Sequence, residues 1–186
     1  MVPNAMKLII LSAVATLGVW IAQPVRAATT REVYNIAKSV TARIDVSQNG
    51  RSIGRGSGFL LKKRGSIYSL ITNKHVTRCP ENSCTYTITT ADGRRYLATD
   101  KQVITSPNLD LAAIEFISSN NYPLARLGDC TAVKPGDIIY TSGFAAEAAG
   151  FTFAGGEVLI NAQRRLSGDR GGYSLVYNAY TRCSSF

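Results

Sequence analysis

The two stretches that decide the fold are Gly56-Ser-Gly-Phe-Leu-Leu61 and Ser69-Leu-Ile-Thr-Asn-Lys-His-Val76. The first is a glycine-rich start to an apolar strand. The second is an apolar strand that stops at His75, which is the only histidine of the chain. Both have the β-branched and aromatic content of strands that are half-buried in a sheet. We therefore expect His75 to stand at the end of a strand in a β-rich domain.

Short β-type runs separated by turn residues continue outward from these stretches. The runs expected as strands are 42–46, 58–61, 67–71, 85–89, 96–99, 111–117, 138–141, 157–160 and 173–177. Many short strands at near-even spacing predict an all-β barrel or sandwich. One short helix is expected over residues 30–40, where apolar residues recur at helical spacing after the N-cap candidate Thr30. The stretch 120–134 is poor in apolar runs, and we expect it to connect two β subdomains.

The N-terminus predicts an export signal. Lys7 precedes an apolar run that ends at Ile21, and small residues at Val25 and Ala27 stand where signal peptidase cleaves. The alternative is a membrane anchor, which needs about 20 apolar residues, and this run is shorter. We expect residues 1–27 to be removed, residues 28–186 to form the folded domain without a membrane anchor, and the protein to be secreted or periplasmic.

The chain is basic, with 21 lysines and arginines, 12 acidic residues and a net charge of +9. These cations are scattered in singles and short groups, and no aromatic residues are interleaved with them as in known nucleic-acid readers. We therefore expect a solvated basic surface and no nucleic-acid partner.

All four cysteines follow the predicted signal peptide, and export would permit disulfides. Cys79 and Cys84 enclose the turn-rich Pro80-Glu-Asn-Ser83, so a local bridge is expected. A zinc site with the one histidine is the competing interpretation. The cysteine spacing is wider than in a zinc knuckle and no second pair follows, so we expect no metal and no cofactor. The sequence leaves the pairing of Cys130 and Cys183 open.

His75 and Asp110 are the candidate catalytic residues. Asp110 stands at the mouth of an apolar strand, 35 residues after His75. A serine hydroxyl is a poor nucleophile at neutral pH, so a base such as imidazole must take its proton during attack. A carboxylate that accepts from the other ring nitrogen orients that base. The alternatives are a turn histidine at a strand end and a solvated aspartate after the turn at 106–108.

Three stretches follow one another in this order: Gly-Ser-Gly-Phe, Leu-Ile-Thr-Asn-x-His-Val, and Asp-Leu-Ala at 110–112. In these stretches the chain resembles trypsin-like peptidases of the chymotrypsin fold. It is most similar to the compact bacterial exported members, over roughly residues 43–182. The resemblance implies two antiparallel β-barrels, the first at about 40–120 and an incomplete second at about 134–186. It also implies His75 as the base and Asp110 as the orienting acid of a serine endopeptidase that acts on proteins or peptides. The interval between them is about 45 residues in the chymotrypsin template, and shorter loops would account for the difference.

The family's nucleophilic serine stands in a Gly-x-Ser-Gly-Gly loop, whose backbone N–H groups form the oxyanion hole. The sequence holds no such motif. Gly168-Asp-Arg-Gly-Gly172 has arginine in the place of serine and follows Asp110 too closely. Ser184 and Ser185 stand near the expected place but have no glycines behind them, so they are weak candidates. Cys183 as a nucleophile meets the same objection. We expect a chain truncated before the serine loop, and a poor catalyst.

Three functions are therefore open at this point. The first is a serine endopeptidase, and the second is an inactive peptidase-like module that binds peptides or proteins. The third is an unrelated exported β-barrel binding protein. Only the first two require His75 and Asp110 within hydrogen-bonding reach of each other. Neither substrate preference nor oligomeric state can be predicted from the sequence.

Overall fold

The computed structural model describes residues 27–81, 83–144, 150–166 and 173–179. The predicted signal peptide, residues 1–27, lies outside these ranges except for Ala27, so it stays a prediction. Within the described ranges, no helix has the length and apolar character that crossing a membrane requires.

The described residues form one α-helix, ten strands and two short 3-10 helices. In chain order these are α1 (Thr30–Val40), β1 (Thr41–Gln48), β2 (Arg51–Arg64), β3 (Ile67–Thr72), η1 (Lys74–Thr77), β4 (Cys84–Thr89), β5 (Arg95–Thr99), η2 (Asp100–Gln102), β6 (Val103–Thr105), β7 (Ala112–Ile117), β8 (Ile138–Gly143), β9 (Thr152–Leu166) and β10 (Tyr173–Tyr177). The predicted all-β class is confirmed. Among these strands β6 was not predicted, because a run of three residues is too short to show a period.

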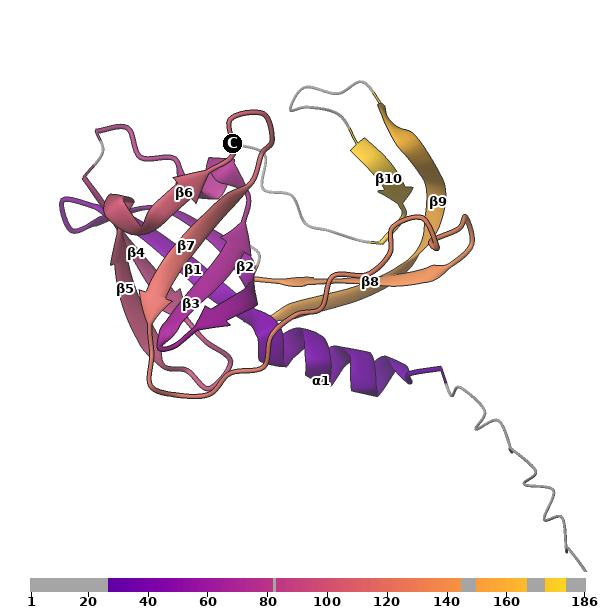
Figure 1. Cartoon of the computed structure of the whole chain (residues 1–186), viewed down its shortest axis with the longest axis horizontal. Helices are drawn as coiled ribbons and strands as arrows, with labels where there is room; N and C mark the ends of the chain where they lie inside the picture. Colours follow the sequence, from indigo (N-terminus) through magenta and orange to yellow (C-terminus); the bar gives the residue numbers. More distant parts are fainter. Residues whose placement is uncertain (1–26, 82, 145–149, 167–172, 180–186) are drawn as a thin grey trace, which may run out of the picture.

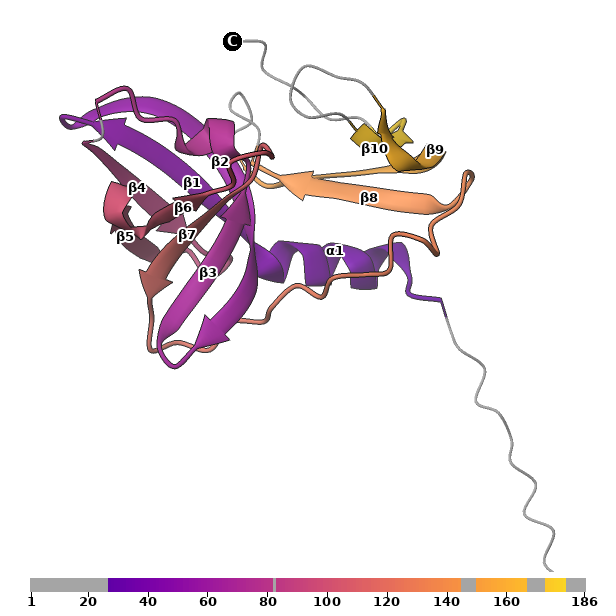
Figure 2. The same ribbon diagram turned by 45° about the horizontal axis from the view of Figure 1, so that its top comes forward.

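Two antiparallel sheets organise the chain. Seven strands in the order β5-β4-β1-β2-β3-β7-β6 curl into a half-barrel, and β10-β9-β8 form a smaller second sheet beside it (Figures 1 and 2). The long strand β2 pairs with β1 along one half and with β3 along the other. This architecture agrees with the chymotrypsin-like fold that the sequence predicts. Residues 118–137, which contain no described helix or strand, run from the first sheet to the second.

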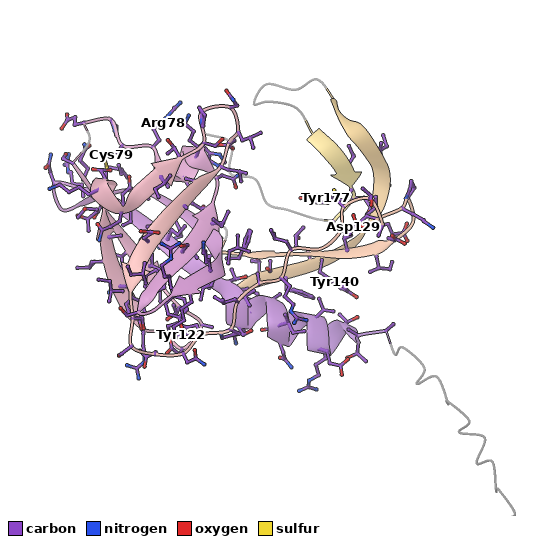
Figure 3. The ribbon with its side chains drawn as sticks, viewed as in Figure 1. Arg78, Cys79, Tyr122, Asp129, Tyr140 and Tyr177 are labelled. Carbon is purple, nitrogen blue, oxygen red and sulfur yellow. A yellow bond between two sulfur atoms is a disulfide. The ribbon has the colours of Figure 1, made fainter. Side chains whose placement is uncertain are left out.

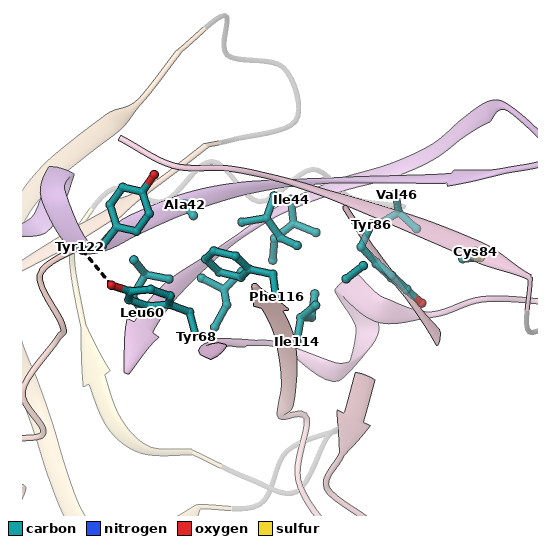
Figure 4. Packing of buried hydrophobic residues seen from close by; sticks show 13 residues of the cluster. Ala42, Ile44, Val46, Leu60, Tyr68, Cys84, Tyr86, Ile114, Phe116 and Tyr122 are labelled. Carbon is teal, nitrogen blue, oxygen red and sulfur yellow. Dashed lines mark hydrogen bonds between the residues drawn. The ribbon is translucent and has the colours of Figure 1, made fainter. Parts of the chain in front are cut away.

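The hydrophobic core lies inside the half-barrel (Figure 4). Alternate residues of β1 point inward, because successive side chains of a strand face opposite sides; these are Ala42, Ile44 and Val46, each at most 1% exposed. The buried ring of Tyr68 stacks on Phe116 at a centroid distance of 5.5 Å. Its hydroxyl accepts a hydrogen bond from the backbone N–H of Tyr122 at 3.0 Å, which keeps a buried polar group satisfied.

Helix α1 begins with a capping box. The Thr29 hydroxyl accepts from the Glu32 backbone N–H, and the Glu32 carboxylate accepts from the Thr29 backbone N–H at 2.6 Å. The N-cap is therefore Thr29, one residue before the predicted Thr30. The hydrogen bond from the Thr29 backbone N–H, and then that from its hydroxyl, hold the pKa of Glu32 below its ordinary value. The hydroxyl of Thr30 instead shares a 2.9 Å hydrogen bond with that of Tyr140.

The second sheet packs on α1 and contacts the middle of β2. Tyr34 of the helix meets Phe153 of β9 edge to face at 5.3 Å, and Phe153 stacks on Tyr140 of β8 at 5.0 Å. The backbone N–H of Phe144, which follows β8, donates to the Ser57 hydroxyl at 2.6 Å. The Ser57–Phe144 hydrogen bond joins the two sheets at the Gly-Ser-Gly-Phe stretch.

Candidate active site

The pairing of β3 with β7 brings the two candidate residues together. These antiparallel strands end with Thr72 opposite Ala112, so the residues after Thr72 lie beside those before Ala112. His75 follows on η1, and Asp110 stands in the loop that leads into β7. Two positions that are 35 residues apart in sequence therefore meet at one end of the half-barrel.

The carboxylate of Asp110 contacts His75 twice. One oxygen, Oδ2, lies 2.7 Å from the ring nitrogen Nδ1 of His75. The other, Oδ1, accepts a hydrogen bond from the backbone N–H of the same residue at 2.9 Å. Because a carboxylate only accepts, the short contact requires a proton on Nδ1, and this leaves Nε2 of the neutral imidazole with a free lone pair.

A third residue, Asn73, holds Asp110 from the other side. Its side-chain amide donates to the Asp110 carbonyl at 3.1 Å and to carboxylate oxygen Oδ2 at 3.3 Å. Asn73 belongs to the Thr-Asn-x-His stretch that the sequence singled out, but its role was not predicted. The position of Asn73 two residues before the histidine was the sequence feature that could have indicated a role. Its partner, Asp110, could be recognised only from the pairing of β3 with β7.

The two side chains of the pair differ in their exposure to solvent. The Asp110 side chain is 22% exposed, whereas that of His75 is 49% exposed. A shielded acid next to an accessible imidazole is the arrangement in which the acid orients the ring and the ring exchanges protons with a bound group. The geometry can therefore support general-base chemistry at Nε2.

Glycines of β2 allow the strand to pass close to this pair. A Cβ atom on Gly56 would lie 2.5 Å from Val76 Cγ1, in the residue after His75. A Cβ atom on Gly58 would lie 2.6 Å from the carbonyl oxygen of Ile71 in β3. The two glycines of the Gly-Ser-Gly-Phe stretch are thus required by close backbone and side-chain approach rather than by a special turn.

The loop after His75 is closed by the predicted disulfide, which is confirmed between Cys79 and Cys84. The hydroxyl of Tyr86 donates to the Thr77 carbonyl at 3.0 Å and to the Asp100 carboxylate at 2.8 Å, and so anchors the end of η1. Burial, and then the hydrogen bond with Asp100, raise the pKa of Tyr86 well above that of an ordinary phenol.

The zinc alternative is not supported at this place. The sulfurs of Cys79 and Cys84 and a carboxylate oxygen of Asp100 lie within 4.8 Å of one another, but the two sulfurs are bonded to each other. A metal needs the free thiolates. His75, which the alternative required, is not part of this group.

A broad open depression of about 1050 Å³ surrounds the pair. Its apolar lining comes from residues of β1, β2, η1 and the loop before β7, among them Val46, Ile53, Val76 and Leu109. His75 and Asp110 stand in its wall. Figure 3 shows the neighbouring Arg78 and Cys79 at this end of the half-barrel and Tyr122 at the opposite end. The volume of the depression is about that of the largest small-molecule pockets, and it is open rather than enclosed.

The remaining sequence candidates lie outside the described residues. These are Ser184 and Ser185, the stretch 168–172, and Cys183. Cys130 is described and is exposed, in the connection between the sheets. The structure therefore brings together His75 and Asp110 and adds Asn73, and it does not test a nucleophile.

Comparisons with known proteins agree with this fold. The profile of the trypsin-like peptidase domain matches residues 56–185. An HtrA-type protease, AlgW, solved with a tripeptide, is 24% identical and superimposes with a TM-score of 0.60 over 75% of this chain. The matched region is 42% of that protease chain, so this chain spans less than half of its length. In all, 227 chains of solved structures match, whereas a search of curated protein sequences finds no match.

Proposed function

Because the chain belongs to the trypsin-like peptidase domain family, we propose that its site is that of a serine-type endopeptidase, with His75 as general base and Asp110 as the acid that orients it. The observation that carries the proposal is the 2.7 Å contact between His75 Nδ1 and Asp110 Oδ2. With the proton on Nδ1, Nε2 is left in the state that can accept the proton of an attacking hydroxyl. Asp110 then stabilises the imidazolium, and Nε2 returns the proton to the leaving amine.

The ligand in this proposal is an extended peptide. The depression is open and partly apolar, and the histidine stands in its wall. The HtrA-type relative of the same fold was solved with a tripeptide, which supports a peptide as the ligand class. The disulfide beside the site supports an oxidising compartment, so we place the protein outside the cytoplasm, secreted or periplasmic.

Peptide binding without cleavage is the second candidate function. It is favoured by the sequence, which contains no Gly-x-Ser-Gly-Gly motif. An oxyanion hole needs backbone N–H groups held in such a loop, and removing one donor alone costs about 10²–10³ in rate. A polypeptide of this sequence is therefore expected to bind peptides and to turn them over poorly.

The proposed function is tested by the NMR signal of the one histidine during peptide titration. We expect unstructured peptides to shift the His75 Hε1 resonance in a saturable way, because they lie across its ring. An Asp92→Asn variant is the control and should give the same shift as the parent. Asp92 lies at the opposite end of the half-barrel, where it accepts a hydrogen bond from the Tyr122 hydroxyl at 3.1 Å. Peptides at millimolar concentration that leave the resonance unmoved would overturn both candidate functions.

Turnover separates the two candidates. No cleavage of unfolded protein above buffer, with a baseline that His75→Ala leaves unaltered, would favour the binding module, and this is the result expected of a polypeptide of this sequence. Labelling of Ser184 or Ser185 by a fluorophosphonate that His75→Ala abolishes would instead show an active serine and exclude the binding module.

A further inference from the structure

Three cations surround the depression beside the candidate pair. They are Arg55 on β2, Lys74 on η1 and Arg78 at the end of η1, and all three are exposed. Among the described residues that line the depression, Asp110 is the single acid, and its carboxylate faces His75 and Asn73. The rim of the site is therefore positively charged in the place where a peptide would lie.

Two of the three cations are held by hydrogen bonds from their own charged groups. The Arg55 guanidinium donates to Asp45 at 2.8 Å, and Asp45 also accepts from Arg43 at 2.8 Å, so one acid is shared by two arginines. The Lys74 ammonium donates to the Ser106 carbonyl at 3.1 Å. For Arg78 the backbone is held, since its N–H donates to the His75 carbonyl at 3.3 Å and the disulfide follows in the chain. Cations held through their charged groups, as Arg55 and Lys74 are, lose less conformational entropy on binding an anion than free side chains do.

We infer that this depression selects acidic peptide segments, with Arg55, Lys74 and Arg78 contacting side-chain carboxylates on either side of His75. The inference rests on the proposed function, which places a peptide across the histidine. Apolar floor residues such as Ile53 and Leu109 suit aliphatic side chains between the acids. A nucleic acid is the less suitable polyanion, because the part of the lining that the structure describes includes no tyrosine, phenylalanine or tryptophan on which a base could stack.

The test is a binding measurement by fluorescence anisotropy with labelled peptides of one length. Three repeats are compared, in which leucine alternates with glutamate, glutamine or lysine. The glutamate peptide is expected to bind most tightly and to weaken as salt is added. Replacing the three cations together (Arg55→Gln, Lys74→Gln, Arg78→Gln) is expected to raise its dissociation constant about tenfold, as removing several partly exposed charge contacts does.

A matched triple variant removes the same charge elsewhere. Arg31→Gln, Arg95→Gln and Arg126→Gln lie on α1, β5 and the connection between the sheets, and none lines the depression. This variant is expected to bind within about twofold of the parent, since distant exposed charges are screened. Equal weakening by both triple variants would overturn the inference, and so would a single-stranded DNA that binds more tightly than the glutamate peptide.

The outcome also separates this inference from the proposed function. If the glutamine peptide binds as tightly as the glutamate peptide and still shifts the His75 resonance, acid selection is wrong and peptide recognition stands. If no peptide of any charge shifts the resonance, the proposed function is wrong as well.

Discussion

Asn73 donates through one side-chain amide to both the backbone carbonyl and the carboxylate of Asp110, at 3.1 and 3.3 Å. The acid is thus held between this amide and His75. Asn73 is not among the described residues that line the depression. It contacts Asp110, so we expect it to act by positioning that acid.

We expect Asn73→Ala to lower the free energy of unfolding by about 1 kcal/mol, the usual net value of a partly exposed hydrogen bond. Because the carboxylate is then less firmly held, the Nδ1 proton of His75 is expected to exchange faster with water and to broaden in the NMR spectrum. Asn108→Ala, in the exposed loop before Asp110, is the control and should leave the proton signal sharp. A sharp signal in both variants would show that Asn73 has no positioning role.

The contact between Gly56 and Val76 is the second testable feature. A methyl group on Gly56 would lie 2.5 Å from Val76 Cγ1. Gly56→Ala is expected to destabilise the fold by about 1–3 kcal/mol, as overpacking of a filled site does. Chemical denaturation measures this, and Val76→Ala in the same chain is expected to restore most of the loss.

Gly54 provides the matched control for that experiment. A Cβ atom there would meet its nearest neighbour, Val46 Cβ, at 4.0 Å, which is ordinary contact. Gly54→Ala should therefore change the stability little. If Gly54→Ala and Gly56→Ala cost the same, the close approach of β2 to the histidine segment is not what the glycine provides.

The hydroxyl of Tyr86 is the third feature. Tyr86→Phe keeps the buried ring but removes the donor to the Thr77 carbonyl and to Asp100. Thr77 is buried, and leaving a buried acceptor without its donor costs about 1–3 kcal/mol, whereas Asp100 still accepts from the Cys84 backbone N–H. The thermal midpoint is expected to fall, and the His75 resonances should move because η1 loses its anchor. Tyr34→Phe, a half-buried tyrosine of α1, is the control; an equal fall in both would contradict a specific role for the Tyr86 hydroxyl.

The capping box of α1 predicts a dependence of stability on pH. Hydrogen bonds from Thr29 hold the pKa of Glu32 below its value in the unfolded chain. The unfolded state therefore binds a proton more readily, so the stabilisation is present above the ordinary glutamate pKa of about 4.3 and is lost as pH falls through the folded value. Glu32→Gln is expected to be less stable than the parent at neutral pH, with the difference closing on acidification. A difference that grows at low pH would contradict this sign.

The sequence predicted the features that depend on local pattern. Alternating apolar residues located most strands within one to three residues, and the turn-rich Pro80-Glu-Asn-Ser83 indicated the Cys79–Cys84 bridge. The helix was predicted at its observed bounds, but its cap was assigned to Thr30 instead of Thr29. Adjacent threonines have the same capping preference, so only the backbone conformation distinguishes them.

Features that depend on contacts between distant segments were not predicted. The partner of Asn73 follows from the register of β3 against β7, and the need for Gly56 follows from the passage of β2 beside Val76. The hydrogen bond between Ser57 and Phe144 joins residues that are 87 positions apart in the sequence. Neither hydrophobic periodicity nor turn residues in a single sequence indicate how distant strands are paired. The motif around His75, in contrast, was enough to predict that this residue stands at the end of a strand.

The most direct test of the proposed site is the protonation of the His75 ring, measured by proton and nitrogen NMR. Since the chain has one histidine, its imidazole signals need no assignment among several. The 2.7 Å contact between His75 and Asp110 predicts that the neutral ring carries its proton on Nδ1, with a downfield, slowly exchanging signal that Asp110→Asn removes. A neutral ring protonated on Nε2 in the folded protein, or an Nδ1 signal that Asp110→Asn leaves unchanged, would contradict the pairing on which the proposed function rests.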